Sequence, residues 1–195
     1  MKLIQTSIPD VVIIEPAVFG DERGWFMESF NEKRFHQELT KLALPIPRPF
    51  VQDNHSCSSK GVLRGLHFQN APHAQGKLVR VVKGSAFDVA VDIRPGSKTY
   101  GQHVSIELTA ENQKMFWVPE GFAHGFVALE DDTHFLYKTT DYYAKDCEGA
   151  IVWNDPELAI KWPRIVGLNE PLINTKDQEA SLWSGFVREM NASDL

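Results

Sequence analysis

Polar and apolar residues alternate with a period of two over much of the chain, a pattern typical of β-strands. Residues 77–83 and 86–94 both alternate, and Gly84 between them is a turn signal. In the second segment, four apolar residues share one face and three charged residues point the other way: Phe87, Val89, Val91 and Ile93 against Asp88, Asp92 and Arg94. The pattern predicts two consecutive strands.

Further short strands are expected for the same reason, separated by turns that contain glycine or proline. They cover residues 11–14, 104–108, 114–118, 126–129 and 133–140. Many short strands at this spacing predict a mainly β fold, either a sandwich or a barrel.

Two segments have a helical pattern instead. Residues 31–39 offer Asn31 as an N-cap and place Phe35 and Leu39 four positions apart. Residues 175–178 resemble a capping box. An apolar stripe at helical spacing follows this box, and it predicts packing in the core or against a second subunit: Leu182, Trp183, Phe186 and Val187.

Length and composition indicate a soluble globular protein with one domain over residues 1–195. Apolar residues make up 43% of the chain, and the formal net charge is −6, which argues against a nucleic-acid surface. An anionic ligand would therefore need a local group of arginines and lysines. We expect neither a membrane span nor a signal peptide. Cys57 and Cys147 form no disulfide framework, which fits a cytoplasmic protein.

Unusual chemistry first appears in the stretch VLRGLHFQ, residues 62–69. Arg64 and His67 are three positions apart, so an ideal strand would turn them to opposite faces. Gly65 lies between them, and a glycine suits a β-bulge, which can redirect side chains beside an active site. We predict a bulge at Gly65 that points both side chains into one cavity.

A metal site is the first interpretation to weigh for His67. The stretch PEGFAHGF, residues 119–126, resembles the second signature of the cupin superfamily, and the first signature would begin at His67. Metal-binding cupins have a second histidine where this chain has Gln69, and neutral glutamine is a weak ligand. His67, His73 and His124 are the only ligand set left, so we expect neither metal nor cofactor.

Acid–base chemistry is the stronger interpretation. His67 could act as a base, and Tyr137 could act as an acid across the same cavity. Lys77 would stabilise a developing oxyanion beside them. This trio suits removal of a proton next to a carbonyl group and return of a proton from the other side.

Several longer stretches carry a family resemblance that extends, in order, to about Pro163. They read FGDERGWF (19–26), FVQDNHS (50–56), VLRGLHFQ (62–69), QGKLVR (75–80), FDVAVDIR (87–94), PEGFAHGF (119–126), FLYKTTDYY (135–143) and WNDP (153–156). Together they resemble the dTDP-4-dehydrorhamnose 3,5-epimerase family, whose members need no cofactor.

The resemblance implies a cupin-type double-sheet jelly roll with an N-terminal arm and a few short helices, one of them C-terminal. It also implies epimerisation at C3 and C5 of dTDP-4-dehydro-6-deoxy-D-glucose in dTDP-L-rhamnose biosynthesis. By resemblance, His67 is the base, Tyr137 the acid and Lys77 the group that stabilises the enolate. The substrate contacts that it implies are Arg23, Phe26, Glu28, Gln52, Asp53, Asn54, Arg64, Lys77, His124, Glu148 and Lys176.

Two further expectations follow from the resemblance. The family forms a homodimer in which N-terminal arms, here within residues 1–30, are exchanged between subunits and complete the nucleotide site. It also orients its catalytic histidine with an aspartate that follows a lysine, and Lys176-Asp177 in the C-terminal helical segment 165–195 is the best match. The alternative for Asp177 is helix capping, since an acidic residue is favourable in a first turn.

Other functions stay open at this point. The chain could epimerise only one carbon or move the ketone of another dTDP-deoxysugar, it could be a metal-dependent cupin, or it could bind a sugar nucleotide without catalysis. Trp25, Tyr142 and Tyr143 could stack on the base or simply pack against the protein.

Overall fold

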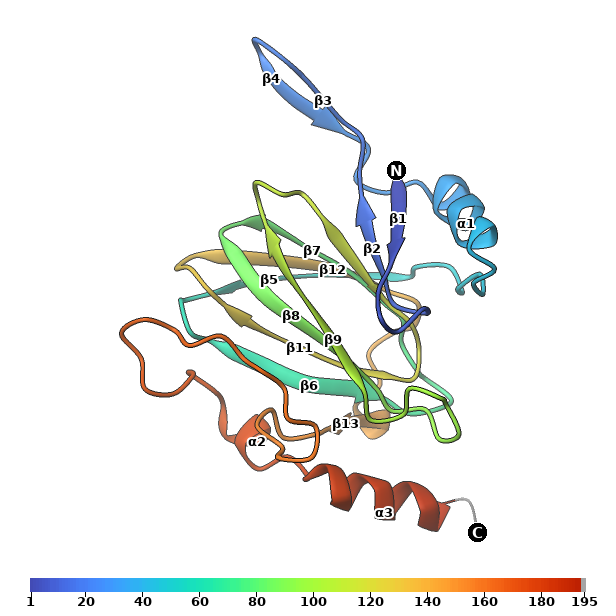
Figure 1. The fold of residues 1–195 in the computed structure, drawn as a ribbon, viewed down its shortest axis with the longest axis vertical. Helices are drawn as coiled ribbons and strands as arrows, with labels where there is room; N and C mark the ends of the chain where they lie inside the picture. Colours follow the sequence, from blue (N-terminus) through green and yellow to red (C-terminus); the bar gives the residue numbers. More distant parts are fainter. Residues whose placement is uncertain (194–195) are drawn as a thin grey trace.

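Two antiparallel β-sheets packed face to face form the body of the protein in a computed structural model that describes residues 1–193 (Figure 1). In spatial order, the six-stranded sheet contains β1 (Lys2–Gln5), β2 (Val12–Glu15), β10 (Met115–Val118), β7 (Lys77–Lys83), β12 (Thr133–Thr139) and β5 (Gln52–Ser58). The five-stranded sheet contains β13 (Glu148–Ala150), β6 (Leu63–Gln69), β11 (Phe122–Ala128), β8 (Ser85–Asp92) and β9 (His103–Thr109). The predicted double-sheet jelly roll is confirmed.

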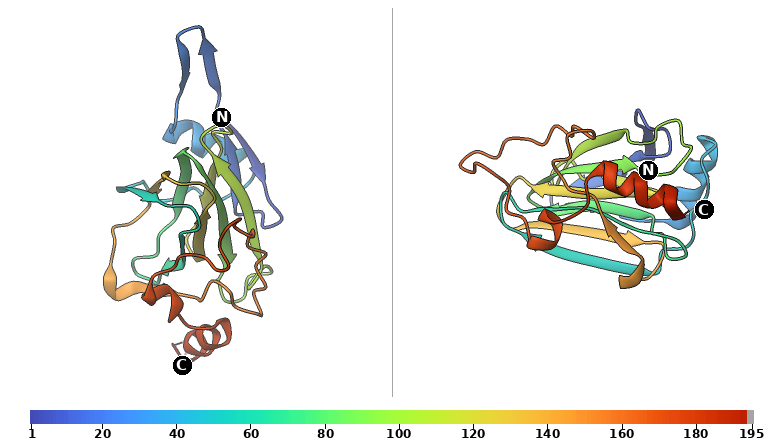
Figure 2. Two further views of the ribbon diagram at one scale, coloured as in Figure 1. Left: turned by 90° about the vertical axis from the view of Figure 1, so that its left-hand side faces the viewer. Right: turned by 90° about the horizontal axis from the view of Figure 1, so that it is seen from below.

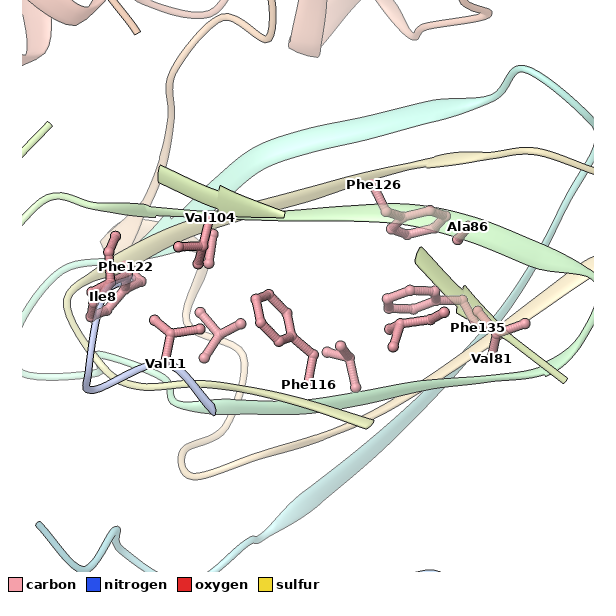
Figure 3. Packing of buried hydrophobic residues seen from close by; sticks show 13 residues of the cluster. Ile8, Val11, Val81, Ala86, Val104, Phe116, Phe122, Phe126 and Phe135 are labelled. Atoms are coloured by element: carbon pink, nitrogen blue, oxygen red, sulfur yellow. The ribbon is translucent and has the colours of Figure 1, made fainter. Parts of the chain in front are cut away.

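The main hydrophobic core fills the space between the two sheets. It is rich in aromatic and β-branched side chains, as Figure 3 shows: Ile8, Val11, Val79, Val81, Ala86, Ala90, Val104, Leu108, Phe116, Val118, Phe122, Phe126 and Phe135. The rings of Phe126 and Phe135 stack across this space with centroids 4.0 Å apart. This core occupies one part of the interior and leaves polar side chains to line another part.

Strand β8 shows how the alternating pattern builds the interior. Its large apolar residues Val89 and Val91 face the C-terminal segment outside the sheet. The alternate residues, Ala86, Asp88 and Ala90, point toward the space between the sheets, and Asp88 is fully buried. The polar face predicted for this strand is therefore an interior face.

Helix α1 (Glu32–Lys41) covers the outer face of the six-stranded sheet. Asn31 caps it as predicted, since its side chain accepts a hydrogen bond from the Arg34 amide. Phe35 and Leu39 are fully buried against Trp117 and neighbouring residues.

The C-terminal segment covers the outer face of the five-stranded sheet. It follows η1 (Lys145–Cys147) and contains α2 (Thr175–Gln178) and α3 (Trp183–Ser193). Trp183 and Phe186 are buried in its core, as predicted, but Leu182 is exposed because it precedes the helix. The N-cap of α2 is Asn174 rather than Thr175, because the Asn174 side chain accepts the hydrogen bond from the Asp177 amide.

A hairpin of β3 (Val18–Asp21) and β4 (Gly24–Met27) projects from the body, as Figure 1 and the left view of Figure 2 show. Of residues 1–30, only this hairpin forms an arm, because β1 and β2 are strands of the six-stranded sheet. Its aromatic residues Phe19, Trp25 and Phe26 are between 61% and 69% exposed. None of the described residues forms a helix long and apolar enough to cross a membrane.

Candidate active site

Two adjoining cavities lie beside the hydrophobic core, with volumes of about 300 Å³ and 340 Å³. We call the first the inner cavity and the second the entry cavity. Four residues line both of them: Asn54, His67, Lys77 and Tyr137. The three residues predicted to carry acid–base chemistry therefore stand where the two cavities meet.

His67 on β6 is held by a buried carboxylate. Its Nε2 atom lies 2.7 Å from Oδ1 of Asp177, which is fully buried. The other oxygen, Oδ2, accepts a hydrogen bond from the Gly65 amide at 3.1 Å. Burial alone would raise the pKa of Asp177, but the hydrogen bond from His67 and its positive charge lower that pKa overall. The Asp177 carboxylate therefore contacts His67, as an orienting residue must, and does not cap α2.

Gly65 produces the predicted bulge. On β11, His124 pairs with His67 and Phe126 pairs with Arg64, so two residues of β6 oppose the single residue Gly125. Gly65 has φ +127°, and a Cβ at this position would lie 2.5 Å from Cα of Gly125. The bulge brings Arg64 and His67 to the wall of the inner cavity, and Nε of Arg64 donates to Oγ of Ser58 at 3.3 Å.

Lys77 reaches the site from β7 in the facing sheet. Its Nζ donates to the carbonyl oxygen of His67 at 3.1 Å, and the side chain is buried. Burial lowers the pKa of Lys77 to about 8, although the charges of Asp88 and Glu148 oppose this shift. The amine is therefore a cation that is poised to titrate near neutral pH.

Tyr137 on β12 lines the cavities from the same sheet as Lys77, while His67 lines them from the other sheet. Burial raises the pKa of the Tyr137 phenol, and the charge of Arg64 partly opposes that effect. The phenol consequently keeps its proton at neutral pH and can act as an acid. His67 and Tyr137 approach the shared space from opposite walls.

A second histidine–carboxylate pair lies at the wall of the inner cavity, where His124 lines it and Asp88 is buried behind. Nε2 of His124 is 2.9 Å from Oδ1 of Asp88, and both residues are buried. Burial raises the pKa of Asp88, while His124 and Lys77 oppose the shift. Asp88 is absent from the residues proposed on sequence grounds, although an aspartate on the inward face of an apolar strand is a usable signal.

Polar residues from three segments form the rim of the entry cavity. Gln52 and Asn54 lie on β5, and Nε2 of Gln52 donates to Oδ1 of Asn54. Oε2 of Glu148 accepts from Nζ of Lys176 at 2.6 Å and from the Tyr143 hydroxyl at 2.9 Å. Burial would raise the pKa of Glu148, but these two hydrogen bonds lower it overall.

Five predicted contacts do not line the two cavities. Lys176 lies at the edge of the entry cavity, where it contacts Glu148, and the other four lie elsewhere in the single chain. The Asp53 side chain points to the opposite face of β5, where it pairs with Lys138 at 2.8 Å, because neighbouring residues of a strand alternate. Arg23 and Phe26 lie on or beside β4 in the projecting hairpin, and Glu28 follows it and pairs with Arg34. None of these side chains lines the two cavities.

The three histidines of the alternative metal site do not form one cluster, although His67 and His124 are cross-strand neighbours. His67 is paired with Asp177, His124 with Asp88, and His73 lies outside both cavities beside Asp141. Among the described residues, no group of three or more His, Cys, Asp or Glu side chains is arranged to hold a metal ion.

Comparison with known proteins identifies the family to which this site belongs. The family model described as dTDP-4-dehydrorhamnose 3,5-epimerase matches residues 5–184. The chain belongs to the dTDP-4-dehydrorhamnose 3,5-epimerase family. It is 54% identical to the Shigella flexneri member over 177 residues, which are 91% of this chain and 93% of that protein.

Solved structures of dTDP-sugar epimerases share the fold. A Legionella pneumophila dTDP-6-deoxy-D-glucose-3,5-epimerase in complex with dTDP-4-keto-L-rhamnose has a TM-score of 0.84 and 49% identity, and the match covers 93% of this chain and 92% of that one. A 3′-monoepimerase from Streptomyces bikiniensis with dTDP-quinovose has a TM-score of 0.86 and 30% identity, covering 97% and 91%. The prediction of an epimerase, an enzyme of the isomerase class, is confirmed.

Proposed function

We propose that the chain converts dTDP-4-dehydro-6-deoxy-D-glucose to dTDP-4-dehydro-L-rhamnose by inverting C3 and C5. The observation that carries this proposal is the approach of His67 and Tyr137 from facing sheets to one space, with the Lys77 amine beside them. Inversion at carbon needs a base on one face of the sugar and an acid on the other, and this arrangement supplies both.

The reaction would proceed through an enolate. The C4 ketone acidifies the hydrogens on C3 and C5, and His67 removes one of them. Because Nε2 of His67 is committed to Asp177, the other ring nitrogen is left to accept that proton. Lys77 stabilises the negative charge that develops on the ketone oxygen. Tyr137 then protonates the same carbon from the opposite face. His67 next releases its proton to solvent and the Tyr137 phenolate takes one up, so the same steps can be repeated at the second carbon.

The remaining polar residues of the cavities would hold the substrate. Arg64 is suited to the diphosphate, because a guanidinium binds phosphate oxygens with two parallel donors. His124 lines the inner cavity with Arg64, while Gln52 and Glu148 line the entry cavity and Asn54 lines both. Lys176, paired with Glu148, would contact the substrate at the outer rim. The Asp53 side chain has no part in this proposal.

Deuterium incorporation in D₂O tests the two catalytic assignments separately. The wild-type enzyme should label C3 and C5 of the 4-keto sugar nucleotide and invert both. H67N should abolish labelling but keep dTDP binding. Y137F should still label the sugar without inverting it, because His67 returns deuterium to the face from which it removed hydrogen.

The control for this experiment is H36N, which changes a histidine on α1 far from the cavities and should behave as wild type. Retained labelling in H67N would refute the assignment of the base. Label at only one carbon in the wild-type product would instead support a single-carbon epimerase, the activity carried by the name of the similar Streptomyces bikiniensis protein.

We also infer a homodimer with exchanged arms. The hairpin exposes Phe19, Trp25 and Phe26, and burial of such side chains against a second subunit would be favourable. Exchange would also explain why Arg23 and Phe26 do not line the cavities of their own chain. Gel filtration with light scattering should show a dimer, and an active monomer would contradict the inference. Both cysteines are unpaired, which supports a cytoplasmic location.

A further inference from the structure

Gln69 occupies an unusual position at the end of β6. It is two residues beyond His67 and only 7% exposed, and it lines the entry cavity. Its Nε2 donates to the carbonyl oxygen of His73 at 2.6 Å and to that of Tyr142 at 3.2 Å. Its Oε1 accepts from the Ala144 amide at 2.9 Å. A single buried side chain thus holds two separate loops.

The loop of residues 142–144 is held mainly by hydrogen bonds, and those to Gln69 are joined by one within the loop's own turn, from the Tyr142 amide to Asp141. The side chains of Tyr142 and Tyr143 are 63% and 56% exposed. The Tyr143 amide donates to Oε1 of Gln52, so two glutamines bind three successive residues of this backbone. Tyr143 lines the entry cavity, and its hydroxyl donates to Glu148 on the same rim.

We infer that Gln69 is a positioning residue that fixes the rim of the entry cavity before the substrate arrives. The inference rests on the proposed function, in which this cavity receives part of a dTDP-sugar. A loop that is already ordered loses less conformational entropy on binding, so a fixed rim increases affinity. The effect should appear in binding of the nucleotide and not in the chemical step, because the Gln69 side chain makes no hydrogen bond to His67, Lys77 or Tyr137.

The chemistry of the amide explains why glutamine suits this position. An amide donates from nitrogen and accepts at oxygen at the same time, and the Gln69 contacts use both. A glutamate could still accept from the Ala144 amide, but it would repel the carbonyl oxygens of His73 and Tyr142. A leucine of similar size would lose all three hydrogen bonds.

Steady-state kinetics and calorimetry on Q69E and Q69L test this inference. Both variants should raise KM for the dTDP-sugar and Kd for dTDP about tenfold and change kcat less than about threefold. Q102E is the matched control, since Gln102 is an exposed glutamine with one backbone hydrogen bond far from the cavity, and it should match wild type. Unchanged KM and Kd, or a fall in kcat alone, would overturn the inference.

Hydrogen exchange supplies a readout that does not depend on catalysis. In the free wild-type enzyme, the amides of Tyr143 and Ala144 should be protected although the loop is exposed. In Q69L these two amides should exchange at least about tenfold faster while those of β8 stay unchanged. Equal exchange in Q69L and wild type would refute the positioning role, even if the wild-type enzyme proved inactive on the proposed substrate. Fast exchange of both amides in the wild-type enzyme would also refute it.

Discussion

The contact between His67 and Asp177 controls which nitrogen of the imidazole is free to react. Asp177 is fully buried, accepts from His67 at 2.7 Å and is itself held by the Gly65 amide. A fixed carboxylate selects the tautomer of the histidine and stabilises the cation that forms when it takes a proton. The same geometry connects the C-terminal segment to the reaction centre in the sheets.

Replacing Asp177 by Asn should lower kcat by about 100-fold or more, since an amide neither stabilises the imidazolium nor fixes the tautomer to the same extent. Turnover of the dTDP-sugar and binding of dTDP are the measurements, and dTDP affinity should stay within about threefold. D146N, which changes an exposed carboxylate on η1, is the control. A normal turnover rate in D177N would remove Asp177 from the mechanism.

The lowered pKa of Lys77 predicts a pH limit for activity. The free enzyme loses the Lys77 charge as the pH rises through about 8, so kcat/KM should fall above that pH. K77R should have a lower rate, but its fall in kcat/KM should move to higher pH, because a guanidinium stays protonated. K138R, on the outer face of β12, is the control. If kcat/KM of K77R falls at the same pH as in the wild type, the fall belongs to another group.

Loss of the Lys77 charge does not itself destabilise the fold at high pH, because the effect of Lys77 on stability has the opposite sign. The folded-state pKa of about 8 lies below the ordinary value of 10.5. Between these two values the unfolded chain binds more protons, so the contribution of Lys77 to the free energy of unfolding rises with pH. Thermal unfolding at each pH point checks this.

At the scale of elements, the bulge in β6 decides which side chains of this strand face the inner cavity. The bulge aims Arg64 and His67 into one cavity, which a regular strand could not do. It was predictable, since a glycine between two polar residues on an apolar strand is a local signal. The loop that Gln69 holds was not predictable, because its hydrogen bonds join residues up to 91 positions apart.

Replacing Gly65 by Ala should lower the free energy of unfolding by about 3 kcal/mol or more, because both the backbone conformation and the contact with β11 oppose a Cβ. G24A is a close control, since Gly24 has φ +129° but nothing within 4 Å of the added Cβ. Its cost should be about 1 kcal/mol. Urea unfolding measures both, and equal costs would show that the contact with Gly125 is unimportant.

At the scale of the whole molecule, both sheets supply residues to the proposed active site. The five-stranded sheet supplies His67 and His124, and the six-stranded sheet supplies Lys77, Tyr137 and Asn54. The C-terminal segment adds Asp177 and Lys176 from outside the sheets. The proposed arm exchange would add residues from a second subunit, so a complete site would use both chains.

Mixing two inactive variants tests arm exchange directly. R23A keeps an intact cavity, and H67N keeps an intact arm. If arms are exchanged, one site of each mixed dimer contains only unaltered residues. Random pairing should then restore about a quarter of wild-type activity per chain after co-refolding. If each arm serves its own chain, mixing restores nothing, and the unmixed variants are the controls.

The sequence by itself predicted strands β2, β7 to β10 and β12, part of β11, helix α1, the three polar side chains that meet at the two cavities, and the family. Periodicity, caps and motifs are properties of neighbouring residues. Only the tertiary structure decided that Asp177 binds His67, that Asp88 faces His124, and that the Asp53 side chain lies outside the cavity. These pairings join residues from different strands and segments. They depend on strand register and on which face of each sheet is buried, which local sequence does not specify.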